Sequence, residues 1–199
     1  MPPARQLEPC DVQAHAPATL HAGRATVAPG FELDVRLARP ADELLLERFF
    51  AEVGADDQRF RLHTALQPVG RAHLGPLLHP DHVHNESVLA FDPAAGRLVA
   101  SAVFVCDADG DTAEIAVTIR PAYRHRGVGW ALLEFLAEEA ARRGIRRVIA
   151  IEDRAEHEGL AGFAAPANDF SGAPTAHRGF VCANVAGEPE LLLLERRLA

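Results

Sequence analysis

The sequence predicts an α/β (α+β) domain. Two observations carry that prediction: short runs of β-branched and aliphatic residues recur along the chain, and longer segments with helical apolar spacing lie between them. Turn residues such as Pro93 and Gly96 separate neighbouring strand-like runs by hairpin-length connections. With 199 residues, 48% of them hydrophobic, the chain can bury one proper core, so a single domain is expected.

The expected elements follow one another as strand, two helices, three strands, helix, strand and a closing pair of strands. Alternating apolar residues predict the strands, and Pro40 with Asp42 predicts the start of the first helix. The expected bounds are, in order, Phe31–Leu37, Pro40–Gly54, 56–80, Ser87–Phe91, Leu98–Cys106, Glu114–Ile119, Val128–Arg143, Arg147–Ile151, Val181–Val185 and Leu191–Arg197. Residues 152–178 are acidic and then rich in glycine and proline, and no element is assigned to them.

Residues 1–30 carry proline, alanine, histidine and glycine without sustained apolar periodicity. We expect them to form a flexible N-terminal extension, and we expect residues 31–199 to form the domain.

Composition excludes several classes of partner. The net charge of −8 disfavours nucleic acid and anionic membranes, because both reward a basic surface. No apolar run reaches the length of a membrane span, and the N-terminus lacks the apolar core of a signal peptide. The three cysteines form no ligand-like pair and leave an odd count, so free thiols and a reducing cytoplasm are expected.

The turn Arg124–Gly129 joins a strand rich in β-branched residues to the long helix. A glycine-rich turn that opens a helix presents unpaired N–H groups and the positive end of the helix dipole, which together favour phosphate. A dinucleotide fingerprint would need a third glycine where Leu132 stands. A P-loop needs a lysine, and the chain contains none.

The pattern Arg-x-x-Gly-x-Gly at Arg124–Gly129 resembles the acyl-coenzyme A pyrophosphate loop of the GNAT N-acetyltransferase superfamily. The element order over residues 32–198 is similar to the GNAT fold, which implies a mixed, mostly antiparallel central sheet with helices on both faces. Further stretches resemble the start of bacterial Pat-like protein-acetyltransferase domains: Val35–Asp42, Phe49–Phe50, Arg59–Arg61 and Ala113–Val117. Pat-like domains acetylate lysine on other proteins, and close relatives act on small amines.

Glu114 matches the position of the general-base glutamate in this family. Transfer of an acyl group to an amine requires the neutral amine, whose conjugate acid has a pKa near ~10.4, so a base must accept a proton. A carboxylate within an apolar strand costs free energy unless it is paired, hydrated or used. The alternative is a solvated glutamate on an open face of the sheet.

The resemblance also implies a set of residues that bind acetyl-CoA, the expected co-substrate, with no metal. Val117 and Ile119 would meet the pantetheine arm, and a strand N–H near Val117 would polarise the thioester oxygen. The pyrophosphate would be surrounded by Arg124, Arg126, Gly127, Val128, Gly129 and Trp130. Arginine adds charge-assisted bonds to phosphate, although Arg126 is expected to contribute mainly through its backbone.

One departure from the family concerns the acid that protonates the leaving thiolate. GNAT enzymes usually carry an asparagine and then a tyrosine in the region that here reads 152–160, and neither residue is present. The only tyrosine is Tyr123, just before the loop. Either the thiolate leaves unaided or His157 substitutes. The sequence thus predicts an acyl-CoA-dependent N-acyltransferase that acts by direct transfer, and the alternative is a non-catalytic acyl-CoA-binding sensor.

Two further clusters of polar residues, one of histidines and one of acidic residues, could bind ligands. The run His79–His84, with His73 before it, has donor types that suit zinc or nickel, but it lies in a proline-broken loop, so an exposed polar loop is expected. An acidic set could attract a cationic amine, or it could be a solvated helix face. Its members are Glu152, Asp153, Glu156 and Glu158.

Overall fold

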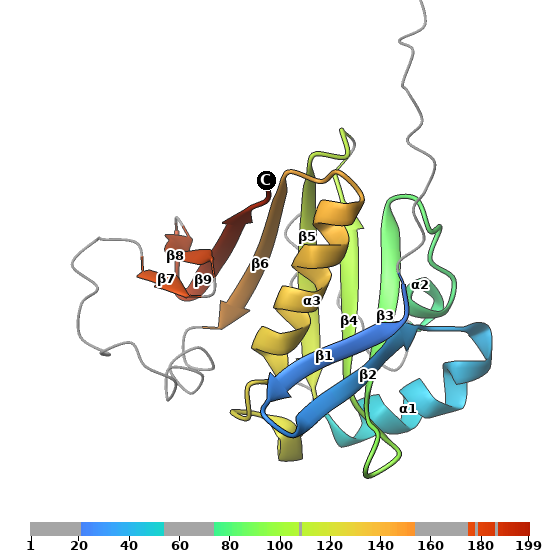
Figure 1. The fold of residues 1–199 in the computed structure, drawn as a ribbon. Coiled ribbons are helices and arrows are strands. Elements are labelled where there is room, and N and C mark those ends of the chain that lie inside the picture. Colours follow the sequence, from blue (N-terminus) through green and yellow to red (C-terminus); the bar gives the residue numbers. More distant parts are fainter. Residues whose placement is uncertain (1–20, 54–73, 108, 154–174, 178, 186) are drawn as a thin grey trace, which may run out of the picture.

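The computed structural model describes residues 21–53, 74–107, 109–153, 175–177, 179–185 and 187–199. Within these residues the chain forms one nine-stranded sheet in the order β1-β2-β3-β4-β5-β6-β9-β8-β7 (Figure 1). Neighbouring strands are antiparallel except β5 and β6, which run parallel. The strands are β1 (Gly23–Ala28), β2 (Phe31–Leu37), β3 (Asn85–Asp92), β4 (Arg97–Cys106), β5 (Thr112–Ile119), β6 (Arg147–Asp153), β7 (Thr175–His177), β8 (Phe180–Val185) and β9 (Glu188–Arg197).

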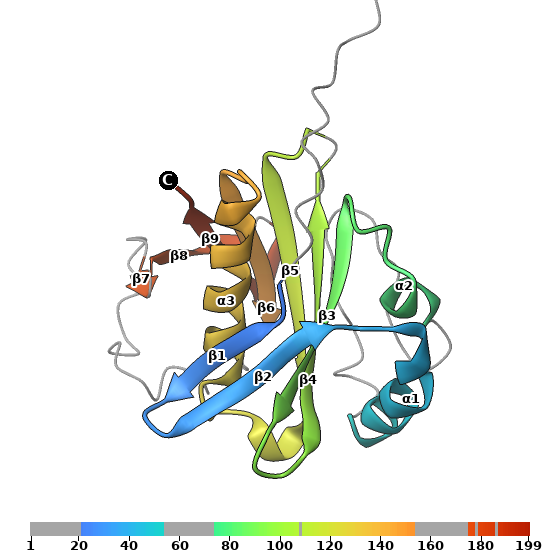
Figure 2. The same ribbon diagram turned by 45° about the vertical axis from the view of Figure 1, so that its right-hand side comes forward.

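Helices cover both faces of this sheet, as Figure 2 shows. The long helix α3 (Val128–Arg142) packs on one face, and its apolar stripe joins the inward residues of β3, β4 and β5 in the larger core. The helices α1 (Glu43–Glu52) and α2 (Gly75–Leu78) pack on the other face around Phe49, Phe50 and Leu77. Short 3₁₀ turns, η1 (Pro40–Asp42) and η2 (Pro121–Tyr123), precede α1 and α3. The predicted fold class is confirmed.

The predicted elements are confirmed where local periodicity is strong. The strand Phe31–Leu37 has the predicted bounds, and α3 ends one residue before the predicted Arg143. Gly144 follows α3 with φ +79, which is the left-handed conformation of a C-terminal glycine cap. The first helix differs in its buried face. Leu46 is buried on its inner side, whereas Leu44 is 66% exposed.

The N-terminal extension was predicted to reach residue 30, and this boundary needs correction. Gly23–Ala28 forms β1, which pairs antiparallel with β2 and packs against α3. Only Ala25 and Val27 face inward from β1, so its alternation is too short and too weakly apolar to stand out in the sequence. Residues 1–20 lie outside the described residues, and so do 54–73 and 154–174. The division into an extension and one domain stays a prediction.

No helix in the described part of the chain is long and apolar enough to cross a membrane.

Cys106, a free thiol at the end of β4, is expected to react slowly with alkylating agents. Burial raises the pKa of the Cys106 thiol from 9.0 to about 11. Because the thiolate is the nucleophile, its fraction near pH 8 falls about 100-fold. Timed iodoacetamide labelling, read by mass spectrometry, should modify Cys106 far more slowly than a peptide thiol, and the difference should narrow toward pH 11. Equal rates at pH 8 would contradict this expectation.

Candidate functional site

Strands β5 and β6 part from each other halfway along the sheet. Their parallel pairing runs only from Thr112↔Arg147 to Ile115↔Ala150. Beyond that point β5 still pairs with β4 as far as Ile119, and β6 still pairs with β9 as far as Asp153. Figure 1 shows β6 slanting away from β5. The facing edges therefore carry backbone groups that no strand pairs on that side in the described part of the chain. We call the space between these edges the β5–β6 gap.

The gap widens toward the C-terminal end of β5, where η2 and the turn Arg124–Gly127 lead into α3. His125 and Gly127 both have positive φ, at 55° and 85°, and Gly127 is the N-cap residue of the helix. The first N–H groups of α3, beginning at Val128, have no intrahelical acceptor. The turn thus places helix-terminal donors, with the positive end of the dipole, at the wide end of the gap.

The structure brings most of the predicted co-substrate residues together. A Cβ built on Gly129 would lie 3.3 Å from Ile119 Cδ1, so the strand end and the helix start are in contact. Val117 and Ile119 are half-buried on the α3 face of β5. Trp130 differs, because its ring packs edge-on against Phe180 at 6.0 Å and is buried in the core. Only the backbone of Trp130 is placed to meet a ligand at the helix terminus.

The two loop arginines have different surroundings. Arg124 Nε lies 3.4 Å from the carbonyl oxygen of Ile119, at the edge of the gap. The guanidinium of Arg126 lies 5.0 Å from the ring centroids of both Phe31 and Tyr123. This cation–π contact directs the Arg126 side chain toward the β1–β2 hairpin. In this arrangement the backbone of Arg126, rather than its side chain, is placed to meet a phosphate.

A set of contacts that the sequence did not reveal holds the turn in place. The hydroxyl of Tyr123 donates to Asp92 Oδ2 at 2.9 Å, and Asp92 Oδ1 accepts the N–H groups of Ala94 and Ala95. The hydrogen bond from Tyr123 lowers the pKa of Asp92 and raises the pKa of Tyr123. Residues Phe31, Asp92, Tyr123 and Arg126 therefore tie the turn to two hairpins, and we call them the loop clamp.

Glu114 lies close to the narrow end of the gap, one residue before the last β5–β6 pair. Its side chain is 3% exposed, so the alternative of a solvated glutamate on an open face is wrong. Glu114 is opposite Val105, which packs against the core formed by α1 and α2. The carboxylate therefore faces α1 and α2, whereas Val117 and Ile119 face α3. Thr118 and its cross-strand neighbour Ser101 are also buried on the Glu114 face.

The candidates for the acid that protonates the leaving thiolate lie apart from Glu114 or outside the described residues. His157, Glu156 and Glu158 lie outside the described residues. Tyr123 is bonded to Asp92 at the opposite end of the gap from Glu114. Glu152 is half-buried near the end of β6.

Two histidines of the loop before β3 are bonded to acidic residues, one in the loop and one in β3. His82 Nδ1 is 2.8 Å from Glu86 Oε2, and His84 Nδ1 is 3.3 Å from Asp81 Oδ2. Among the described residues no group of three or more histidine, cysteine or acidic side chains is placed to hold a metal ion. His73 lies outside the described residues.

Comparisons with known proteins agree with this geometry. A family model described as the acetyltransferase (GNAT) family matches residues 45–165. No curated protein matches the chain. The GNAT domain of S. lividans PAT is 24% identical with a TM-score of 0.65, covering 89% of this chain and 97% of that domain.

Two further solved structures are similar to the chain. An acetyltransferase from Thermus thermophilus is 22% identical with a TM-score of 0.52, covering 83% of this chain and 97% of its own. The PaiA N-acetyltransferase from Thermoplasma acidophilum, in complex with coenzyme A, is 14% identical with a TM-score of 0.54, covering 83% of this chain and 98% of its own. At these identities the likeness establishes the fold.

Proposed function

The chain belongs to the acetyltransferase (GNAT) family, and from that membership we propose that it transfers an acyl group, acetyl in the first instance, from acyl-CoA directly to the nitrogen of an amine. The observation that carries the proposal is the β5–β6 gap, which has a helix-terminal turn at its wide end and the buried carboxylate of Glu114 at its narrow end. The stretch of β5 that does not pair with β6, residues 116–119, spans about 13 Å at the usual rise of a strand. An extended thioester that starts at the turn would therefore carry its acyl group toward Glu114.

On the acyl-CoA side, the chain supplies mostly backbone groups. The N–H groups of Gly127, Val128 and Gly129 would bind the pyrophosphate, with Arg124 adding a charge-assisted bond. The edge of β5 at Val117 and Ile119 would bind the pantetheine arm. An N–H group near Val117 would stabilise the negative charge that develops on the thioester oxygen. The solved PaiA structure, which has this fold and holds coenzyme A, supports acyl-CoA binding by this chain.

On the acceptor side, Glu114 would accept the proton of the amine, directly or through one water. The neutral amine nitrogen then attacks the thioester carbon, the C–S bond breaks to release the thiolate, and the second proton of the nitrogen passes to that thiolate or to solvent. A thiol pKa of ~8.5 makes that thiolate a fair leaving group without a dedicated acid. Because Glu114 faces α1 and α2, the amine is expected to enter from that face, opposite α3.

The acceptor is a protein lysine or a small amine, and the net charge of −8 suits a cationic molecule of either kind. The non-catalytic alternative is an acyl-CoA sensor, which the missing tyrosine at 152–160 favours. The buried Glu114 favours the enzyme, because a sensor has no use for a carboxylate inside the sheet. A reducing cytoplasm stays the predicted location.

Release of coenzyme A thiol from acetyl-CoA, measured against a panel of lysine peptides, polyamines and aminoglycosides, tests the proposal. An enzyme is expected to release thiol faster with at least one amine than with none. Saturable acetyl-CoA binding without amine-dependent release from any member would establish the sensor instead.

The loop clamp leads to a separate prediction for Tyr123→Phe. This change removes the hydroxyl that donates to Asp92 but keeps the ring beneath Arg126. The turn then loses one of the contacts that order it, so acetyl-CoA must order the turn as it binds. We expect KM for acetyl-CoA to rise roughly 3- to 10-fold with kcat nearly unchanged, because Tyr123 acts on the turn and not on the reacting atoms.

Steady-state kinetics with each substrate varied in turn measures this split. Arg146→Gln is the control, since it removes a polar contact of another turn, the ion pair from Arg146 to Asp111 just before β5. If the Tyr123→Phe enzyme has the wild-type KM for acetyl-CoA, the hydroxyl of Tyr123 does not order the turn for binding.

A further inference from the structure

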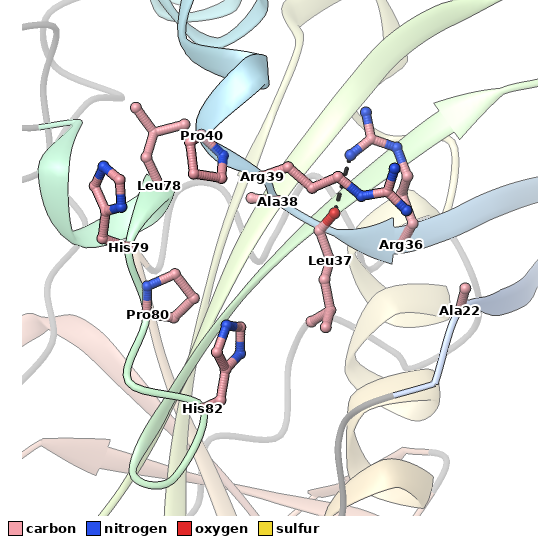
Figure 3. A pocket seen from close by; sticks show the side chains of 10 residues that line it. All are labelled: Ala22, Arg36, Leu37, Ala38, Arg39, Pro40, Leu78, His79, Pro80 and His82. Carbon is pink, nitrogen blue, oxygen red and sulfur yellow. Dashed lines mark hydrogen bonds between the residues drawn. The ribbon is translucent and has the colours of Figure 1, made fainter.

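A cavity lies outside the β5–β6 gap, where the end of β2 meets the connection from α2 to β3. Its volume is about 490 Å³, within the size range of small-molecule sites. Figure 3 shows the side chains that line it. They are Ala22, Arg36, Leu37, Ala38, Arg39, Pro40, Leu78, His79, Pro80 and His82. Four of these can carry positive charge and none is acidic, in a chain whose net charge is −8.

Arg36 forms a fixed wall of this cavity. Its Nη1 and Nη2 donate to the two carboxylate oxygens of Asp42, each at 2.7 Å, and Nη1 also donates to the carbonyl oxygen of Leu37 at 2.9 Å. The same carboxylate accepts the backbone N–H of Arg39 at 2.8 Å. Asp42 therefore lies behind the lining, neutralises Arg36 and anchors the backbone from which the Arg39 side chain extends. In Figure 3 that side chain runs across the upper part of the cavity.

His82 is oriented by a second buried carboxylate. Its Nδ1 lies 2.8 Å from Oε2 of Glu86, which is fully buried and accepts a 2.7 Å bond from Arg143 Nη2 at its other oxygen. This contact fixes the plane of the ring and leaves Nε2 as the ring nitrogen that Glu86 does not engage. Nε2 has no hydrogen-bond partner among the described residues. The ring borders the cavity (Figure 3), and half of the side chain is exposed.

The loop that carries His82 is held in a costly conformation. His82 has φ +60, a left-handed conformation that a non-glycine residue keeps only where its surroundings enforce it. Asp81 does so: Oδ1 accepts the N–H groups of Val83, His84 and Asn85 at 2.8–2.9 Å. Desolvation alone would raise the pKa of Asp81, but these bonds outweigh it and lower that pKa to about 2. The strained residue is thus retained in a position where its imidazole lines the cavity.

We propose that this cavity binds a small organic anion, a carboxylate or a phosphate ester with a short apolar body. Arg39 and the Nε2 atom of His82 would bind the anionic group. Binding would place the ring of His82 between Glu86 and the ligand, so that each ring nitrogen faces an anionic group. Leu37, Leu78 and the prolines would contact the apolar body. The site is separate from the β5–β6 gap and does not depend on the proposed acyl transfer.

The test is a titration of the uniformly ¹⁵N-labelled full chain with benzoate, phenyl phosphate and inorganic phosphate, with neutral benzamide alongside. Imidazole ¹H–¹⁵N correlation spectra report each ring nitrogen of His82 directly. A saturable shift of His82 Nε2 is expected with an anion and not with benzamide. Comparison of benzoate, phenyl phosphate and inorganic phosphate identifies the preferred head group and shows whether the apolar body contributes.

Arg39→Gln should weaken this binding about tenfold or more, since a charge-assisted bond is lost. Arg147→Gln is the matched control: it removes the same charge from an exposed arginine at the start of β6 and should bind as the wild type does. Acetyl-CoA stabilisation of the Arg39→Gln protein should be unchanged, which separates this site from the gap. A wild-type protein without a saturable His82 shift overturns the proposal, as does an Arg39→Gln protein with wild-type affinity.

Discussion

Gly127→Val is expected to abolish most of the stabilisation that acetyl-CoA gives to the protein. At 100 times the dissociation constant, a ligand that binds only the folded state adds about 2.7 kcal/mol, or roughly 5–10 °C in Tm for a chain of this size. Gly127 has φ +85 at the N-cap of α3, and a Cβ there would lie 3.5 Å from Val27 Cγ1. A branched side chain would distort the turn and block the approach of phosphate to the backbone.

The matched control is Gly144→Val at the opposite end of the same helix. Gly144 has φ +79, close to that of Gly127, but a Cβ there would meet nothing within 4 Å. Both variants therefore carry a similar backbone strain, of about 1–2 kcal/mol or more, and should start from a lowered Tm. Only Gly127→Val should lose the response to acetyl-CoA in a thermal-shift titration.

The outcomes separate two questions. A wild-type protein that shows no response at millimolar acetyl-CoA would reject the acyl-CoA proposal itself. A Gly127→Val protein that responds as strongly as Gly144→Val would keep acyl-CoA binding but move it away from the helix terminus. Gly129→Val is a second probe, because its Cβ would press on Ile119 at 3.3 Å, at the strand end where the pantetheine arm is proposed to lie.

Local patterns were enough to predict most of the elements and the turn. The alternation of Leu33 and Val35 and the helical stripe of α3 are set by near neighbours in the chain, and the glycines of the turn require particular backbone angles. Strand β1 escaped detection because only two small apolar residues mark its inner face. It becomes a strand through pairing with β2 and packing on α3.

The site depends on contacts between distant segments, which is why the sequence revealed it only in part. The β5–β6 gap depends on how far β6 follows β9 instead of β5, and no residue of β5 encodes that. The burial of Glu114 is imposed by the face that α1 and α2 cover. The bond from Tyr123 to Asp92 joins residues 31 positions apart. A lone tyrosine just before the turn was the only hint of the loop clamp in the sequence.

Glu114→Gln is expected to lower turnover by roughly 10²–10⁴-fold at neutral pH while acetyl-CoA affinity is kept. Glutamine preserves the shape of the side chain but cannot accept the proton of the amine. The matched control is Glu139→Gln, because Glu139 is also buried, at 2% exposure, but lies on α3 and contacts Arg142. A loss of turnover common to both variants would indicate damage to the fold, whereas a loss confined to Glu114→Gln would indicate its chemistry.

The pH–rate profile distinguishes a base from a structural residue. An alkylammonium acceptor has a pKa near ~10.4, so each unit of rising pH below that value supplies about tenfold more neutral amine without help from the protein. The loss of turnover of Glu114→Gln relative to the wild type should therefore shrink as pH rises from 7 toward 10. The turnover of Glu139→Gln relative to the wild type should not change with pH. Equal turnover of Glu114→Gln and wild type at every pH would leave proton removal to bulk water or to His157. Glu114 would then be a buried residue that serves the sheet and not the reaction.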